Sequence, residues 1–176
     1  MNLTSSLWGP GRNGNSASEY IAAWRHVVHI FRSRGVKNVS WVWSPNVDCS
    51  GKCPFNRFYP GDSYVDWVAL DGYNYASVLG MPWESFAEVF SSSYSEMLAV
   101  SHKPFMVAET ASTEVGGDKA AWIRQAFLVD LPSRFPQIRA AIWFDVDLET
   151  DWRVDSSPAS LAAFRDVVAS PLYGGM

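Results

Sequence analysis

Four short apolar runs, separated by segments with helical spacing, constrain the fold of this chain most. The runs cover residues 39–43, 67–70, 103–109 and 138–144. Parallel strands that helices cover on both faces have near-continuous apolar sequences, whereas strands with one solvated face alternate. Strands that alternate with helices are typical of the α/β class. We therefore expect about four parallel strands with helices between them.

Capping residues mark where the helices begin. Ser16 followed by Glu19 is a capping-box pattern, so a helix is expected to start there. Asp118 is a second candidate N-cap, and Ser157 before Pro158 is a third. The apolar spacing predicts buried faces that carry Tyr20, Trp24, Val27, Val28 and Phe31 in the first helix and Leu161, Phe164 and Val168 in the last.

Length and charge place this chain among ordinary globular domains. Its 176 residues, 48% of them hydrophobic, suffice for one domain with a core, which we expect to span residues 1–176. The net charge is -4 and the basic residues are scattered, so we expect neither nucleic acid nor membrane as a partner. No apolar run has the length of a transmembrane helix, and the first residues lack a signal-peptide pattern.

The aromatic residues indicate a carbohydrate ligand. Nine Trp, seven Tyr and ten Phe are present, many beside Gly, Pro, Asn or Asp. Flat rings stack on the C–H faces of sugars while nearby polar groups bind hydroxyls, although several of these rings could simply pack the core.

The cysteines and the glycines point to no cofactor. Cys49 and Cys53 could form a small disulfide, which would indicate an oxidising compartment. A zinc site is disfavoured because there is no second cysteine pair and no histidine nearby. No Gly-x-Gly-x-x-Gly or phosphate-loop motif follows a strand, so we expect neither metal nor nucleotide cofactor.

Polar residues gather at the ends of the predicted strands. In a (β/α) barrel these ends build the active site. Glu109 stands out, because a carboxylate that ends an apolar strand costs desolvation unless it is paired. We favour a catalytic role for Glu109 beside Tyr73 and a structural role for Asp71 and Asp147. The full set is Asn46, Asp71, Tyr73, Asn74, Glu109, Asp145 and Asp147.

Four ordered motifs cover nearly the whole chain. They read WVWSPN at 41–46, YPGDSYVDWVALDGYN at 59–74, KPFMVAE at 103–109, and WF at 143–144 with DWRVDSSP at 151–158. Together they resemble the family 26 glycoside hydrolases, the β-mannanase group. The resemblance implies a (β/α)8 barrel, a secreted protein, and retaining endo-hydrolysis of a β-linked plant polysaccharide.

The resemblance also implies roles for individual residues. Glu109 matches the nucleophile, Tyr73 the tyrosine that holds it, and Trp143 the aromatic platform under the sugar. A retaining glycosidase needs a second, protonated carboxyl about 5–5.5 Å from the nucleophile. The predicted substrate-binding residues are Trp143, Trp43, Asn46, Asp71, Asn74, Trp8 and Trp83.

The N-terminus departs from the family pattern. Met1 and Asn2 match the residues that directly follow the acid/base glutamate, so this glutamate is expected just before Met1. The chain then corresponds to the C-terminal half of a (β/α)8 barrel, which as a whole needs about 250 residues. Uncovered strand edges recruit partners, so we expect a homodimer that completes the barrel. Candidate substitute donors are Asp71, Asp145 and Glu114, and we expect weak or absent hydrolysis.

Two other functions remain open. The chain could be a catalytically impaired half-barrel that binds oligosaccharide or acts as a self-associating folding unit. An esterase that uses Ser44 or Ser112 is disfavoured, because neither serine lies in a Gly-x-Ser-x-Gly elbow and His102 precedes its strand.

Overall fold

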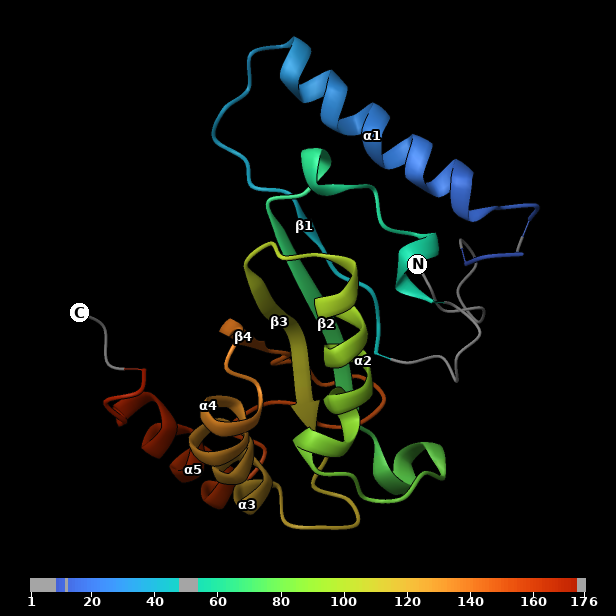
Figure 1. Ribbon diagram of the computed structural model, residues 1–176. Coiled ribbons are helices and arrows are strands. Elements are labelled where there is room, and N and C mark those ends of the chain that lie inside the picture. Colours follow the sequence, from blue (N-terminus) through green and yellow to red (C-terminus); the bar gives the residue numbers. More distant parts are fainter. Residues whose placement is uncertain (1–8, 12, 48–53, 174–176) are drawn as a thin grey trace. The chain divides into compact units, whose positions relative to one another are not determined.

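The computed structural model describes residues 9–11, 13–47 and 54–173. Its strands are β1 (Val42–Trp43), β2 (Trp67–Asn74), β3 (Phe105–Ser112) and β4 (Ile138–Trp143), in the order β1-β2-β3-β4 (Figure 1). Its helices are α1 (Ala17–Ser33), α2 (Phe86–Val100), α3 (Lys119–Arg124), α4 (Leu131–Arg134) and α5 (Pro158–Ala169). Strand β1 pairs with β2 in parallel. The predicted α/β class with four strands is confirmed.

The chain divides into two compact units. Unit 1 contains the residues up to Asp71 together with Ser92–Met106, and unit 2 contains Gly72–Ser91 together with the residues from Val107 onward. Strands β2 and β3 and helix α2 pass from one unit into the other. The single domain expected over residues 1–176 stays a prediction, and each unit is described by itself below.

Helix α1 of unit 1 begins at the predicted capping box. The Ser16 hydroxyl accepts the Glu19 backbone N–H at 3.2 Å, and the Glu19 carboxylate accepts the Ser16 backbone N–H at 2.8 Å. Two of the N–H groups that an α-helix leaves unpaired at its start are thereby satisfied.

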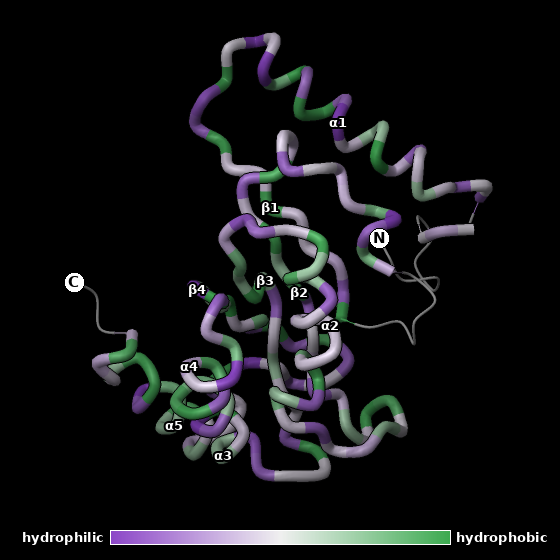
Figure 2. The backbone as a smooth tube through the Cα atoms, viewed as in Figure 1, coloured by the Kyte–Doolittle hydropathy of each residue, from purple (hydrophilic) through white to green (hydrophobic). Residues whose placement is uncertain are grey.

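The predicted buried face of α1 is only partly buried. Apolar and polar residues alternate along the helix (Figure 2), and Val28 is its one fully buried residue. Val27 is 43% exposed and Phe31 is also exposed. The helix is anchored instead by longer side chains, since the Trp24 indole N–H donates to the Tyr64 carbonyl at 2.9 Å.

The core of unit 1 forms around Trp43 in β1. This side chain is fully buried, and its ring meets those of Phe55 and Tyr59 at centroid distances of 6.1 and 5.1 Å. Strand β1 is shorter than predicted, because residues 39–41 make no ladder and Val39 is exposed.

Unit 2 contains a continuous helical stretch and a helix that packs against it. The stretch consists of α3, a π-helical segment (Gln125–Asp130) and α4. Asp118 caps α3 by accepting the Ala121 N–H at 2.8 Å, and Ser157 caps α5, both as predicted. Helix α5 packs on α3 but buries Val167, whereas the predicted Val168 is 52% exposed. None of the helices in the described residues is long and apolar enough to cross a membrane.

Candidate active site

Glu109 and Tyr73 meet in unit 2. The Tyr73 hydroxyl donates a hydrogen bond to the Glu109 carboxylate, as the sequence analysis expected. Glu109 lies on β3 and is partly exposed, and the strand continues beyond it to Ser112. The backbone of Glu109 therefore belongs to β3 near the C-terminal end of the strand, where the hydrogen bonds of the sheet hold it in place.

Three further aromatic rings surround Tyr73. Phe144, Trp152 and Tyr75 lie at ring-centroid distances of 5.5, 5.4 and 5.5 Å from it. Trp152 and Tyr75 also meet each other edge to face at 5.2 Å. We call these four rings the Tyr73 cluster. The sequence analysis assigned no role to the other three, although Phe144 and Trp152 belong to the motifs that it quoted.

The structure places Trp143 against the helices. Its ring contacts Trp122 and Phe164 at 6.1 and 6.3 Å, and its indole N–H donates to the Trp152 carbonyl at 2.8 Å. Successive residues of a strand point to opposite faces, so Phe144, not Trp143, packs on Tyr73. These contacts do not support the predicted role of Trp143 as a platform beside Glu109.

The buried side chain of Lys119 binds the loop that follows β4. Lys119 is fully buried, and its ammonium donates to the carbonyls of Asp151 and Arg153 at 3.1 and 2.8 Å and to the Ser156 hydroxyl at 2.9 Å. Burial lowers the pKa of this ammonium, whereas nearby carboxylates, first Glu114, act to raise it. The loop that carries Trp152 is therefore held at three points by one charged group.

Glu114 belongs to the same buried network. Its carboxylate accepts the hydroxyls of Ser156 and Ser160, both at 2.7 Å. Burial raises the pKa of this carboxyl, but the serine hydrogen bonds and the charge of Lys119 outweigh that effect, and the net pKa is lowered.

We expect unit 2 to lose stability at acid pH because of Glu114. A pKa below the ordinary value of 4.5 in the folded state contributes stability above pH 4.5, which is lost as pH falls through the folded pKa. Urea unfolding measured between neutral and acid pH should show that the free energy of unfolding falls less with decreasing pH in Glu114→Gln than in the wild type. Glu84→Gln removes a carboxylate elsewhere in the unit and should keep the wild-type slope; equal slopes in all three proteins contradict the assignment.

Each of the three carboxylates considered as a substitute proton donor already accepts a hydrogen bond within the fold. Glu114 accepts two serine hydroxyls, and Asp145 accepts the Val154 N–H at 2.7 Å. In unit 1, Asp71 accepts the Ser44 hydroxyl at 2.6 Å. The Asp151 carboxylate also stays ionised, because hydrogen bonds from Arg153 lower its pKa to about 2.

Several predicted substrate-binding residues have structural roles. Asn74 is fully buried, donates to the Ser112 hydroxyl at 3.0 Å and accepts the Glu84 N–H at 3.0 Å. The fully buried Trp43 likewise has no ring face available to a sugar. The fold uses both ends of the Asn74 amide and covers the whole Trp43 ring, which does not support a substrate-binding role for either residue.

The remaining predicted residues lie elsewhere. Asn46 pairs with Asp71 through an isolated parallel β-bridge in unit 1. The Trp83 ring in unit 2 packs closely on the backbone of Gly117. A Cβ atom added to Gly117 would lie 2.4 Å from this ring. Its partly exposed ring borders a hollow of about 410 Å³ at the start of α2 and α3. Trp8, Cys49 and Cys53 lie outside the described residues.

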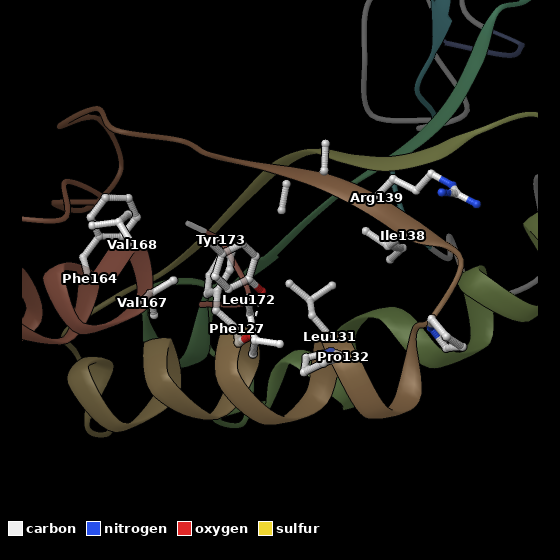
Figure 3. A pocket seen from close by; sticks show the side chains of 13 residues that line it. Phe127, Leu131, Pro132, Ile138, Arg139, Phe164, Val167, Val168, Leu172 and Tyr173 are labelled. Atoms are coloured by element: carbon white, nitrogen blue, oxygen red, sulfur yellow. Dashed lines mark hydrogen bonds between the residues drawn. The ribbon is translucent and has the colours of Figure 1, made fainter. Parts of the chain in front are cut away.

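An apolar groove of unit 2 contains none of the predicted site residues. Apolar side chains from the π-helical segment, α4, α5 and the C-terminal segment gather beneath β4 and enclose about 500 Å³ (Figure 3). Phe127, Leu131 and Ile138 line it, and Arg139 is its one charged side chain. In the described part of the chain, no group of three or more acidic, histidine or cysteine side chains could hold a metal ion.

Comparison with known proteins identifies the family. Residues 4–97 match the model described as glycosyl hydrolase family 26. The chain belongs to this family. Endoglucanase H from Acetivibrio thermocellus is 44% identical over 159 residues, which are 89% of this chain and 17% of that protein. Mannan endo-1,4-beta-mannosidase from Bacillus subtilis is 29% identical over 84% of this chain and 38% of its own length.

The fold agrees with solved structures of family 26. A mannanase from Bacillus subtilis superposes with a TM-score of 0.60 at 26% identity, over 95% of this chain and 45% of that chain. The four strands and their helices match part of the TIM barrel of such family 26 enzymes. The chain thus spans less than half the length of each of these relatives, and the predicted family and barrel-type fold are confirmed.

Proposed function

We propose that this chain carries the nucleophile of a retaining endo-β-glycanase, and that Glu109 is this nucleophile. The observation that supports the proposal is the hydrogen bond from the Tyr73 hydroxyl to the Glu109 carboxylate inside the Tyr73 cluster. A carboxylate that attacks an anomeric carbon must be ionised and held in one rotamer. A hydrogen bond from the Tyr73 hydroxyl holds the carboxylate in one rotamer, and the aromatic contacts of Tyr73 hold that hydroxyl in place.

The relatives suggest two substrates for the same site. The 44% identical relative is named an endoglucanase, and the 29% identical relative is named for mannan. We therefore propose a β-linked glucan as the preferred polymer and mannan, which the resemblance implied, as the second. Both polymers are too large to enter a cell, so we propose that the protein acts outside it.

The test uses a substrate that needs no proton donor. A dinitrophenyl 2-deoxy-2-fluoro-β-cellobioside loses its leaving group without acid assistance, and the fluorine slows hydrolysis of the glycosyl-enzyme. We expect the protein mass to rise by one fluorocellobiosyl group, with the modified peptide containing Glu109. The mannobioside analogue, measured in parallel, ranks the two sugars. Absence of labelling together with measurable oligosaccharide binding would favour the binding-module function.

We propose that this chain alone hydrolyses natural polymers weakly. The three carboxylates considered as proton donors, Asp71, Asp145 and Glu114, each accept a hydrogen bond within the fold, which supports this proposal. Reducing-sugar release from glucan and mannan measures this directly.

We expect Tyr73→Phe to slow labelling of Glu109 by about 10- to 100-fold, since a hydrogen bond to a charged group contributes about 1.5–3 kcal/mol. The phenylalanine keeps the ring contacts with Trp152 and Phe144, so only the hydroxyl is lost. The rate of dinitrophenolate release measures the effect. Tyr94→Phe, in the other unit, is the matched control and should react like the wild type. Equal rates in all three proteins would show that the hydroxyl does not assist Glu109.

We also propose self-association through β4. This strand is the last in the order of the sheet, its residue Ile142 is 53% exposed, and the apolar groove lies beneath it (Figure 3). An exposed apolar edge strand is a template for pairing with a second copy.

We expect a dimer at micromolar concentration by multi-angle light scattering and a monomer for Ile142→Lys, because a lysine on an edge strand opposes pairing. Val129→Lys changes an exposed valine that does not line the groove and should remain dimeric. A folded wild-type monomer rules the dimer out.

A further inference from the structure

Glu149 is a carboxylate bound to the Tyr73 cluster, and no role was predicted for it from the sequence. It lies on the loop between β4 and α5, it is exposed, and its Oε2 accepts the Trp152 indole N–H at 3.2 Å. Trp152 is buried and packs on both Tyr73 and Tyr75. Glu149 and Glu109 are therefore each bonded to a member of the same aromatic cluster, Trp152 and Tyr73 respectively.

Tyr75 packs on the same indole ring that binds Glu149. It meets Trp152 edge to face at 5.2 Å and Tyr73 at 5.5 Å, and it is partly exposed. Its pKa is raised, first by burial and then by the negative charges of Glu149 and Glu109, which agrees with these contacts.

Glu149 differs from Asp145, Asp147 and Asp151 of the same loop. Asp145 accepts a backbone N–H, and Asp151 and Asp147 pair with Arg153 at 2.7 and 3.8 Å. Among the described residues, Glu149 accepts one hydrogen bond, from the Trp152 indole N–H. An exposed carboxylate with four lone-pair sites retains capacity to accept hydroxyl donors from a ligand.

The loop that carries Glu149 is held in place from within unit 2. The Lys119 ammonium fastens residues 151, 153 and 156, and the Thr150 hydroxyl meets the Thr113 hydroxyl at 3.0 Å. A ligand group on this loop is therefore pre-organised, and it loses little entropy on binding.

We propose that Glu149 is a substrate-binding carboxylate, which accepts hydroxyl hydrogen bonds from the sugar bound at Glu109, with the partly exposed Tyr75 ring beside it and the buried Trp152 holding the carboxylate in place. This inference rests on the proposed function of Glu109. A carboxylate beside an aromatic ring suits a neutral β-linked oligosaccharide, because it accepts two neighbouring hydroxyls while the Tyr75 ring covers part of the C–H surface.

The test is the affinity of Glu149→Gln for cellotetraose and mannotetraose, measured by calorimetry. Glutamine keeps an acceptor for the Trp152 indole, so the loop stays in place while the charge is lost. We expect about 10- to 100-fold weaker binding of the preferred tetrasaccharide, since hydrogen bonds to charged groups contribute about 1.5–3 kcal/mol. Asp166→Asn, which removes an exposed carboxylate paired with Arg124, is the matched control and should bind like the wild type.

The outcomes separate this inference from the proposed function. Affinity of Glu149→Gln within about twofold of the wild type, or absence of binding by the wild type, overturns the role of Glu149. At saturating fluorocellobioside, Glu149→Gln should still be labelled on Glu109, because the nucleophile is intact. Weakened binding without labelling of any protein would leave Glu149 as a ligand group and refute Glu109 as the nucleophile.

Discussion

Replacement of Glu109 by alanine should abolish covalent labelling by the fluorocellobioside, with a loss of reaction rate on the order of 10⁴-fold or more. Glu109 is the residue to which the Tyr73 hydroxyl donates, so its loss removes the atom that forms the bond to the anomeric carbon. Intact-protein mass spectrometry and dinitrophenolate release measure the two consequences. Glu96→Ala, a carboxylate of unit 1 that caps the Phe55 N–H, should still be labelled.

A chemical rescue distinguishes loss of the nucleophile from loss of the fold. In Glu109→Ala, azide can occupy the space of the carboxylate, attack the anomeric carbon of the unfluorinated dinitrophenyl β-glycoside and displace dinitrophenolate. The product is an α-glycosyl azide, because a single displacement inverts the configuration. Rescue with this stereochemistry supports the role of Glu109, whereas labelling of the alanine variant at wild-type rate contradicts it.

Replacement of Lys119 by methionine should destabilise the protein by about 3–5 kcal/mol. The methionine fills the same space but leaves the carbonyls of Asp151 and Arg153 and the Ser156 hydroxyl without their charged donor. Buried acceptors that lose a partner pay their desolvation cost in full. Urea unfolding followed by far-UV circular dichroism measures the change in the free energy of unfolding.

Lys37→Met is the matched control, because Lys37 is exposed in the loop after α1 and the same atoms are replaced. We expect its unfolding midpoint to remain that of the wild type. A Lys119→Met protein as stable as this control would show that the buried ammonium does not hold the loop. The destabilised loop should also lower tetrasaccharide affinity, since it carries Trp152 and Glu149.

The local structure around the caps was predictable because it depends on residues close in sequence. Ser16 with Glu19, Asp118, and Ser157 before Pro158 each begin a helix where their side chains indicate. Burial was less predictable. Val168 has the same hydropathy as Val167, and only the packing of α5 on α3 decides which of the two is covered.

The candidate site likewise has a part that was predictable from the sequence and a part that was not. Glu109 and Tyr73 could be paired from the sequence, because each lies near the end of a predicted strand and the motifs place them in one family. Trp143 and Phe144 are adjacent aromatic residues, and their sequence does not say which one faces the helices. The sequence also suggested Asn74 and Trp43 as substrate-binding residues, although both side chains make their contacts inside the protein.

Local propensity and motifs sufficed to predict the family, the α/β class, the capped helix starts and a carboxylate near the end of a strand. The tertiary structure was needed to show that Tyr75 and Trp152 pack on Tyr73, that Glu149 binds the Trp152 indole, and that the Lys119 ammonium binds the loop that carries Trp152 and Glu149. The physical reason is that contacts between distant residues depend on how strands and loops pack, and hydrogen bonds across that packing are invisible in a linear pattern.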